Sequence, residues 1–236
     1  MSTKARYRSA ILHYFESLTQ ETVFNLAPAY FKDDFLGRAL ESTDRWMLRS
    51  LGFATETLKA GAPNGVLELA LTAAVELQLA GVDWANQRSL VLNQCLGAEI
   101  RYRFTTLPAG ASTAVFGLCG DHNAAIDTVA ESLWFRHDAS GAITVEHDDT
   151  VHESSKVATG VTLLAGQWVI VRIDCSVITD VKFYVNGNRV AASTTFDMSQ
   201  VAALALQPVA RLDKAAAAPN VGVAEVDYIA VWQKRS

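Results

Sequence analysis

The chain has 236 residues, of which 50% are hydrophobic and 19% charged, so it is long enough to bury the core of one large domain or two small ones. Its formal net charge of −5 argues against a general affinity for nucleic acid or anionic membranes. The sequence has no apolar run of about 18 residues and no early apolar stretch of signal-peptide length, so we expect neither a membrane span nor a secretion signal.

Residues 1–30 form a separate segment, which we expect to be an arm or a hairpin ahead of the main domain. Its apolar and aromatic side chains fit a helical stripe and fit a hairpin equally well, so periodicity leaves both open. The segment is basic at its start, because Lys4, Arg6 and Arg8 come with no acid before Glu16. This is typical of an arm that docks on another molecule, although a frayed terminus or an additional edge strand explains it as well.

From Gly65 onward, the sequence consists of short strand-like runs separated by turn signals. Alternating runs include "GVLELALT", "VELQLAG", "AEIRYRF" and "QWVIVRIDC". In the second of these, Val75 and Leu77 are placed on one face with Leu79. Many short strands with few helical runs between them predict an all-β antiparallel sandwich or barrel.

The stretch "DVKFYVNGNRVAAS" is the clearest local signal. Period-two alternation on both sides of Asn186-Gly187 predicts a β-hairpin with a two-residue turn, because this dipeptide tolerates positive φ at both central positions. Residues 121–130 and 198–206 are each compatible with a helical turn. The predicted core consists of alternating apolar residues of these strands: Ile100, Tyr102, Phe104, Phe116, Trp134, Trp168, Val171, Phe183, Val185, Ile229 and Val231.

The three cysteines, Cys95, Cys119 and Cys175, lie far apart in apolar runs. An odd number without paired spacing argues for free, reduced thiols and for synthesis in a cytoplasm. We therefore expect small buried side chains and assign the cysteines no chemistry.

Two stretches carry a resemblance to a known fold. The pair "QWVIVRIDCS" and "VKFYVNGNRVAAS", with the final strand "VDYIAVWQ", resembles the laminin G-like and concanavalin A-like jelly-roll superfamily. The resemblance implies a two-sheet jelly-roll sandwich over residues 31–236, behind the arm of residues 1–30. It implies little about function, since this fold carries many functions.

A wider set of stretches resembles structural proteins of tailed-bacteriophage virions: "DDFLG", "FGLCG", "ESLWFRHD", "ITVEHDDT", "TTFDMS" and "LQPVARLDK". The resemblance implies a capsid decoration or cement protein located in the virion and made in the bacterial cytoplasm. Its implied partners are the major capsid protein and copies of itself, without nucleic acid, membrane or cofactor. Arginine and aromatic residues commonly anchor interfaces, so the capsid-contact residues would be those of the arm, namely Lys4, Arg6, Tyr7, Arg8, Tyr14 and Phe15.

The jelly-roll class also includes β-glucanases, which carry Glu-x-Asp-x-x-Glu on one strand. This chain has Glu225 and Asp227, but Ala230 occupies the third position. Without the second glutamate, the leaving group cannot be protonated in the usual way. We therefore expect no catalytic residues and rank a glycan-cleaving enzyme third among the functions.

The stretch "EHDDTVHE", residues 146–153, is the densest cluster of candidate metal ligands. His147 and His152 are five residues apart, so on a strand they would point to opposite sides. The repeated aspartates and glycine of a calcium loop are absent. A solvated acidic loop is the better interpretation, and we predict no metal.

Trp84, in the turn-like "GVDWANQ", is the one tryptophan expected to be exposed. It is a candidate for stacking on a sugar ring, with packing over a sheet edge as the default. This residue and the acidic loop favour the alternative function, a carbohydrate-binding module of a phage fibre or head projection that binds a host-surface glycan. The other four tryptophans are assigned to the core or its rim.

Overall fold

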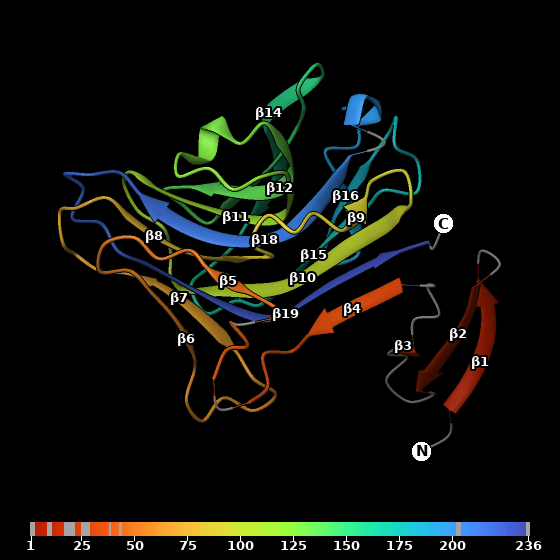
Figure 1. Cartoon of the computed structure of the whole chain (residues 1–236), viewed down its shortest axis with the longest axis horizontal. Coiled ribbons are helices and arrows are strands. Elements are labelled where there is room, and N and C mark those ends of the chain that lie inside the picture. Colours follow the sequence, from red (N-terminus) through yellow and green to blue (C-terminus); the bar gives the residue numbers. More distant parts are fainter. Residues whose placement is uncertain are drawn as a thin grey trace.

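The structure is a computed structural model that describes residues 3–8, 11–16, 22–24, 29–37, 39–42, 44–201 and 204–234. Side chains are described from Tyr30 onward, except for Leu96. All strand pairs of the described residues are antiparallel, and the main body is a sandwich of two eight-stranded sheets, drawn in Figure 1. The predicted all-β, two-sheet jelly-roll sandwich is confirmed.

The first sheet, called the β10 sheet, contains the longest strands of the chain. Its order is β17 (Asn188–Val190), β16 (Lys182–Val185), β15 (Val169–Asp174), β10 (Cys95–Thr106), β19 (Gly222–Gln233), β7 (Leu67–Leu71) and β6 (Thr55–Leu58). Strand β4 (Ala29–Asp33) pairs with the other half of β19. The C-terminal strand β19 therefore lies inside the sheet, with β10 on one side and β4 and β7 on the other.

The second sheet, called the β11 sheet, covers the β10 sheet. Its order is β14 (Glu153–Thr162), β13 (Ala142–Asp149), β12 (Glu131–Asp138), β11 (Ser112–Cys119), β18 (Ala205–Lys214), β8 (Gln78–Asp83) and β5 (Met47–Leu48), and β9 (Leu90–Val91) also pairs with β18. The two segments compatible with helical turns contain the 3₁₀ turns η1 (Ile126–Thr128) and η2 (Ser199–Val201). Among the described residues, no helix is long and apolar enough to cross a membrane.

The arm contains strands, which answers the question that periodicity left open. β1 (Thr3–Arg8), β2 (Ile11–Glu16) and β3 (Thr22–Phe24) form a small antiparallel sheet of their own. Lys4 pairs with Phe15, and Arg6 pairs with His13. The side chains of the predicted contact residues Lys4, Arg6, Tyr7, Arg8, Tyr14 and Phe15 lie outside the described part of the structure.

The core fills the space between the two large sheets. Tyr102 of β10 stacks on Phe116 of β11 with ring centroids 3.8 Å apart, so the central strands of the two sheets are in direct contact. The predicted core residues are buried in this cluster, with two exceptions. Trp134 is buried in a second small cluster with Ile126 and Val129, and Trp168 is only half-buried. The three cysteines are buried, as predicted.

The Asn186-Gly187 hairpin forms as predicted. Val185 pairs with Asn188, and the φ angles of the two turn residues are 48° and 79°. The turn is also fixed to β15: the Asn186 N–H donates to the Ile170 carbonyl at 2.8 Å, and the Ile170 N–H donates to Asn186 Oδ1 at 2.9 Å.

The prediction that Val75, Leu77 and Leu79 share one face of a strand was partly wrong. Val75 and Leu77 are exposed, and only Leu79 is buried. Strand β8 begins at Gln78, so the alternation ahead of it lies in a loop and does not place side chains on a sheet face.

Candidate functional site

The candidate site lies on the outer face of the β10 sheet, and strand alternation puts its charged residues there. Ile100, Tyr102 and Phe104 of β10 point into the core, so Arg101 and Arg103 between them point outward. The register pairs Arg103 directly with Glu225 of the neighbouring strand β19.

A break in the register adds a second carboxylate to the same face. Arg101 pairs with Tyr228 and Tyr102 pairs with Val226, so Asp227 is the extra residue of a β-bulge in β19. A bulge re-aims the side chains that follow it. As a result, both Asp227 and Tyr228 are partly exposed on the outer face, while Val226 is buried.

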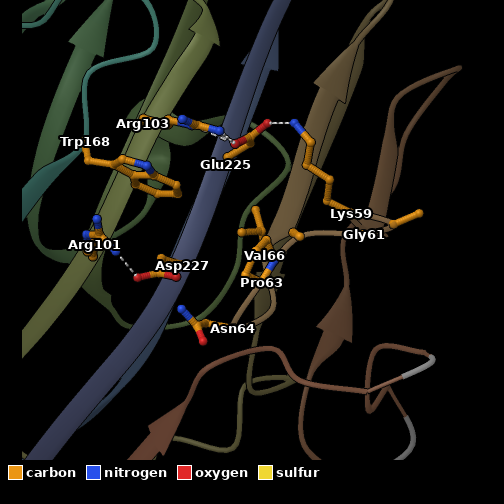
Figure 2. A pocket seen from close by; sticks show the side chains of 12 residues that line it. Lys59, Gly61, Pro63, Asn64, Val66, Arg101, Arg103, Trp168, Glu225 and Asp227 are labelled. Atoms are coloured by element: carbon orange, nitrogen blue, oxygen red, sulfur yellow. Dashed lines mark hydrogen bonds and ion pairs between the residues drawn. The ribbon is translucent and has the colours of Figure 1, made fainter.

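These residues line an open hollow of about 420 Å³. Its floor is formed by strands β10 and β19, and one wall is the segment 59–64 that follows β6. Trp168, just before β15, forms the opposite wall (Figure 2). The hollow thus combines an aromatic ring, three cations and two carboxylates: Trp168, Lys59, Arg101, Arg103, Glu225 and Asp227.

Glu225 holds two of the three cations, Lys59 and Arg103, in place. Its Oε2 accepts a hydrogen bond from Arg103 Nε at 2.7 Å and forms an ion pair with Arg103 Nη2 at 2.6 Å. Its Oε1 accepts a hydrogen bond from Lys59 Nζ. Burial opposes ionisation of this fully buried carboxyl, but the hydrogen bonds and charges of Lys59 and Arg103 outweigh burial and hold the pKa of Glu225 below its usual value. The carboxylate is therefore ionised and fully engaged.

Trp168 lies between the two arginines, as Figure 2 shows. The guanidinium carbons of Arg101 and Arg103 lie 4.6 Å and 4.5 Å from the centre of its ring. Arg101 Nη1 also donates to Asp227 Oδ2 at 2.5 Å. Cation–π contacts and ion pairs thus hold the indole and the two guanidinium groups together on the sheet, with the indole half-buried.

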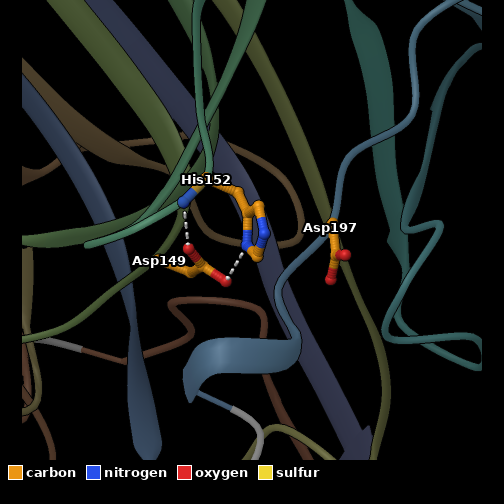
Figure 3. A group of neighbouring side chains, drawn as sticks. All are labelled: Asp149, His152 and Asp197. Atoms are coloured by element: carbon orange, nitrogen blue, oxygen red, sulfur yellow. Dashed lines mark hydrogen bonds and ion pairs between the residues drawn. The ribbon is translucent and has the colours of Figure 1, made fainter.

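A second cluster of polar side chains joins the turn after β13 to the segment before η2. Asp149, His152 and Asp197 offer ligand atoms within 4.8 Å of one another (Figure 3). The fully buried Asp149 already accepts hydrogen bonds from the N–H groups of Val151, His152 and Gln200 and contacts His152 Nδ1 at 3.0 Å. These bonds occupy both oxygens, so Asp149 anchors the turn to the η2 segment.

The interpretation of residues 146–153 as a solvated loop is wrong for residues 146–149, which belong to β13, whereas residues 150–153 are exposed. Asp149 and His147 are buried, and His147 packs against the ring of Phe196 with centroids 5.3 Å apart. Burial opposes ionisation of Asp149, but its hydrogen bonds from His152, Gln200 and Val151 prevail and lower its pKa. The hydrogen bond to that carboxylate in turn raises the pKa of His152.

Trp84, the residue expected to be exposed, is half-buried against other aromatic rings. Its ring lies 5.1 Å from that of Phe31 and 6.4 Å from that of Trp46. It does not line the hollow. The packing interpretation thus describes its surroundings. Trp168 is also half-buried, but it lines the hollow.

Comparisons with known proteins support the fold and no closer relationship. The sequence matches no protein-family model and no curated protein. Among solved structures, a Mycobacterium marinum β-1,3-glucanase is 16% identical, with a TM-score of 0.57 over 86% of this chain and 97% of that one. A Bacteroides ovatus GH16 protein of a mixed-linkage glucan locus, in complex with a G4G4G3G product, is 12% identical, with a TM-score of 0.59 over 85% and 99%.

The carbohydrate-recognition domain of Emp47p is also similar, at 11% identity and a TM-score of 0.59 over 87% of this chain and 95% of that domain. At such identities, the likeness defines a class of fold: this chain is a concanavalin A-like jelly-roll sandwich. Several of the similar solved structures are named as glycan-cleaving enzymes or carbohydrate-recognition domains. Others are a Shewanella oneidensis protein of unknown function and a botulinum neurotoxin binding domain in complex with synaptotagmin.

The capsid decoration or cement function is corrected by these findings. The similar structures include a glucanase, an endo-β-galactosidase, an alginate lyase and carbohydrate-recognition domains, and none of those named is a virion protein. The resemblance of the short stretches to phage proteins therefore has no counterpart among the named similar structures. The contact role of the arm residues and the capsid partner rested on that resemblance and have no support here, and location in a virion stays an untested prediction.

Proposed function

We propose that this protein is a carbohydrate-binding domain and that the hollow beside Trp168 binds a glycan without cleaving it. The observation that carries the proposal is an open hollow in which Trp168 lies within cation–π distance of Arg101 and Arg103, beside ion-paired carboxylates. Binding sites for small polar ligands commonly combine an aromatic surface with a few fixed polar groups. Sugars offer both apolar ring faces and many hydroxyl groups to such a surface.

Rigidity supports binding by this surface. Each polar side chain of the hollow's floor has a partner before any ligand arrives: Glu225 holds Lys59 and Arg103, and Asp227 holds Arg101. A surface fixed in advance loses little conformational entropy when it binds a ligand. The fold neighbours that are named as carbohydrate-recognition domains add support from the class of fold.

The charges of the two carboxylates argue against hydrolysis. A retaining glycosidase needs one carboxylic acid with a raised pKa and a second carboxylate that attacks the sugar. Here the pKa of Glu225 is lowered and Asp227 is paired with Arg101. Ala230 is buried where the third residue of the glucanase pattern would stand. The proposal is therefore recognition and not cleavage.

The test is glycan binding by the full chain, measured on an array and then by calorimetry, with Trp168→Ala and its matched control Tyr184→Ala. Tyr184 lies on the same sheet and also has an arginine over its ring, Arg172 at 4.9 Å, but it does not line the hollow. We expect Trp168→Ala to weaken binding about tenfold or more and Tyr184→Ala to leave it unchanged.

A protein that binds no glycan, or a Trp168→Ala variant that binds as tightly as the wild type, would contradict the proposal. Release of new reducing ends from the bound polysaccharide would show that the protein cleaves the glycan and would contradict the proposal of binding alone.

A further inference from the structure

We infer that the glycan bound in this hollow is acidic and that a carboxylate of a uronic acid unit is recognised by Arg101 together with Lys59. This inference rests on the proposed function and names its ligand class. It follows from which charged groups of the hollow face the open space.

The cations of the hollow are exposed, whereas the anions are covered. The side chains of Lys59, Arg101 and Arg103 are 39%, 35% and 28% exposed, and those of Glu225 and Asp227 are 0% and 14% exposed. The carboxylates thus form the floor, and the positive groups form the surface that a ligand meets. Because Coulomb interactions weaken steeply in water, the groups nearest the ligand decide its preferred charge.

The total charge of the protein does not produce this preference. The chain carries a net charge of −5, so an anionic ligand must be attracted by a local arrangement. Glu68 lies 3.9 Å from Lys59 and brings the nearby charges close to balance, but it does not line the hollow. The positive character is therefore confined to the hollow's inner surface.

Arg101 has the free donors that a carboxylate requires. Among the contacts of the described residues, its only hydrogen bond is the one from Nη1 to Asp227, so Nε and Nη2 remain for a ligand. A guanidinium group donates two parallel hydrogen bonds to the two oxygens of a carboxylate, which gives geometric selectivity as well as attraction. Arg103 is used differently, because its Nε and Nη2 are both bound to Glu225.

A sulfate ester on a glycan shares the negative charge and also offers two oxygens to a guanidinium fork, so a sulfated glycan is the necessary comparison. Uronate polymers are the probes for the carboxylate itself. An alginate lyase is among the proteins with a similar fold, at 11% identity and a TM-score of 0.58.

The experiment compares acidic probes with their uncharged, carboxyl-reduced counterparts. Oligogalacturonate and oligoalginate are titrated into the full chain beside their carboxyl-reduced forms, with a sulfated glycan and neutral mixed-linkage glucan as further arms. We expect an acidic oligosaccharide to bind about tenfold more tightly than its reduced form at low salt, and the preference to shrink at high salt.

The variant Arg101→Gln, which keeps hydrogen-bond donors but removes the charge, is expected to lose the preference for the acidic probe. Arg172→Gln is the matched control, because Arg172 is on the same face of the sheet outside the hollow. A thermal melt of each variant verifies that it is folded.

Equal binding of acidic and reduced probes overturns this inference and leaves the proposed function standing. Tighter binding of the sulfated glycan than of both uronates overturns the carboxylate assignment. Absence of binding to every probe, neutral glucan included, overturns the proposed function and the inference together.

Discussion

Arg103 and Glu225 face each other directly across strands β10 and β19, and two guanidinium nitrogens lie 2.7 Å and 2.6 Å from the same carboxylate oxygen. The other oxygen of Glu225 binds Lys59, which follows the edge strand β6. One buried carboxylate therefore ties the wall of the hollow to its floor. The same residue fixes the fold locally and sets which charges reach the solvent.

Replacing Glu225 by glutamine is expected to destabilise the protein by about 1–3 kcal/mol. The change removes the negative charge and leaves Lys59 and Arg103 beside a buried neutral amide. The loss is smaller than for a fully buried pair, because both cations are partly exposed. Denaturant unfolding measures the difference, with Asp227→Asn as a control expected to cost less than about 1 kcal/mol. Equal stability of Glu225→Gln and wild type would contradict the structural role.

The contribution of Glu225 should depend on pH with a definite sign. Its pKa is lower in the folded chain than the ordinary value of 4.5, so its stabilising contribution is present above that value and is lost as pH falls through the folded pKa. The difference in unfolding free energy between wild type and Glu225→Gln should therefore stay constant near neutral pH and close only below about pH 4.5. Unfolding curves of both proteins across this range give the measurement. A difference that already closes near neutral pH would show that the pKa is not lowered.

His137 should make the stability of the protein depend on pH in a higher range than Glu225 does. It lies in the core, where its Nε2 is 2.8 Å from the Tyr102 hydroxyl, and burial lowers its pKa from 6.5 to about 4. The unfolded chain binds a proton on this residue between those values and the folded chain does not, so stability must fall as pH decreases from 6.5 to about 4. By linkage the loss approaches about 3 kcal/mol.

The variant His137→Gln should flatten this slope, measured by unfolding at several pH values. His122 is a second contributor of the same sign, because burial and the nearby Arg211 and Arg49 lower its pKa to about 4 as well. A His122→Gln variant removes that second contribution separately. An unchanged slope in both variants would mean that other groups cause the acid sensitivity.

The alternation in the sequence predicted most of the sandwich, because side chains on a half-buried strand follow a period of two. The run "AEIRYRF" correctly placed Ile100, Tyr102 and Phe104 inside, and it thereby implied that Arg101 and Arg103 face outward. What the run did not contain is the partner of each arginine. Those partners belong to β19, more than a hundred residues later, and the pairing depends on the sheet order.

Trp168 was predicted to lie in the core because it is hydrophobic, although the period-two alternation of its strand places it on the outer face. Val169, Val171 and Ile173 are buried, so the same alternation places Trp168 and Ile170 on the outer face. The assignment of Trp168 to the core followed its residue type and contradicted its position. The bulge at Asp227 is a different case, because nothing in the local sequence of β19 marks the extra residue.

Replacing the half-buried Trp168 should affect binding more than stability. A fully buried tryptophan costs about 3–5 kcal/mol when it is changed to alanine, whereas this half-buried ring, held by Arg101 and Arg103, should cost only about 1–2 kcal/mol. Phe116→Ala provides the contrast, because that ring is fully buried and stacks on Tyr102, and it should cost about 3–5 kcal/mol. Denaturant unfolding ranks the two variants, and calorimetry with the tightest glycan probe compares their binding at a temperature where both are folded. We expect Trp168→Ala to lose binding with little loss of stability, and Phe116→Ala to lose stability while its folded fraction still binds. A larger stability loss for Trp168→Ala than for Phe116→Ala would show that Trp168 is part of the core and would contradict its role in the site.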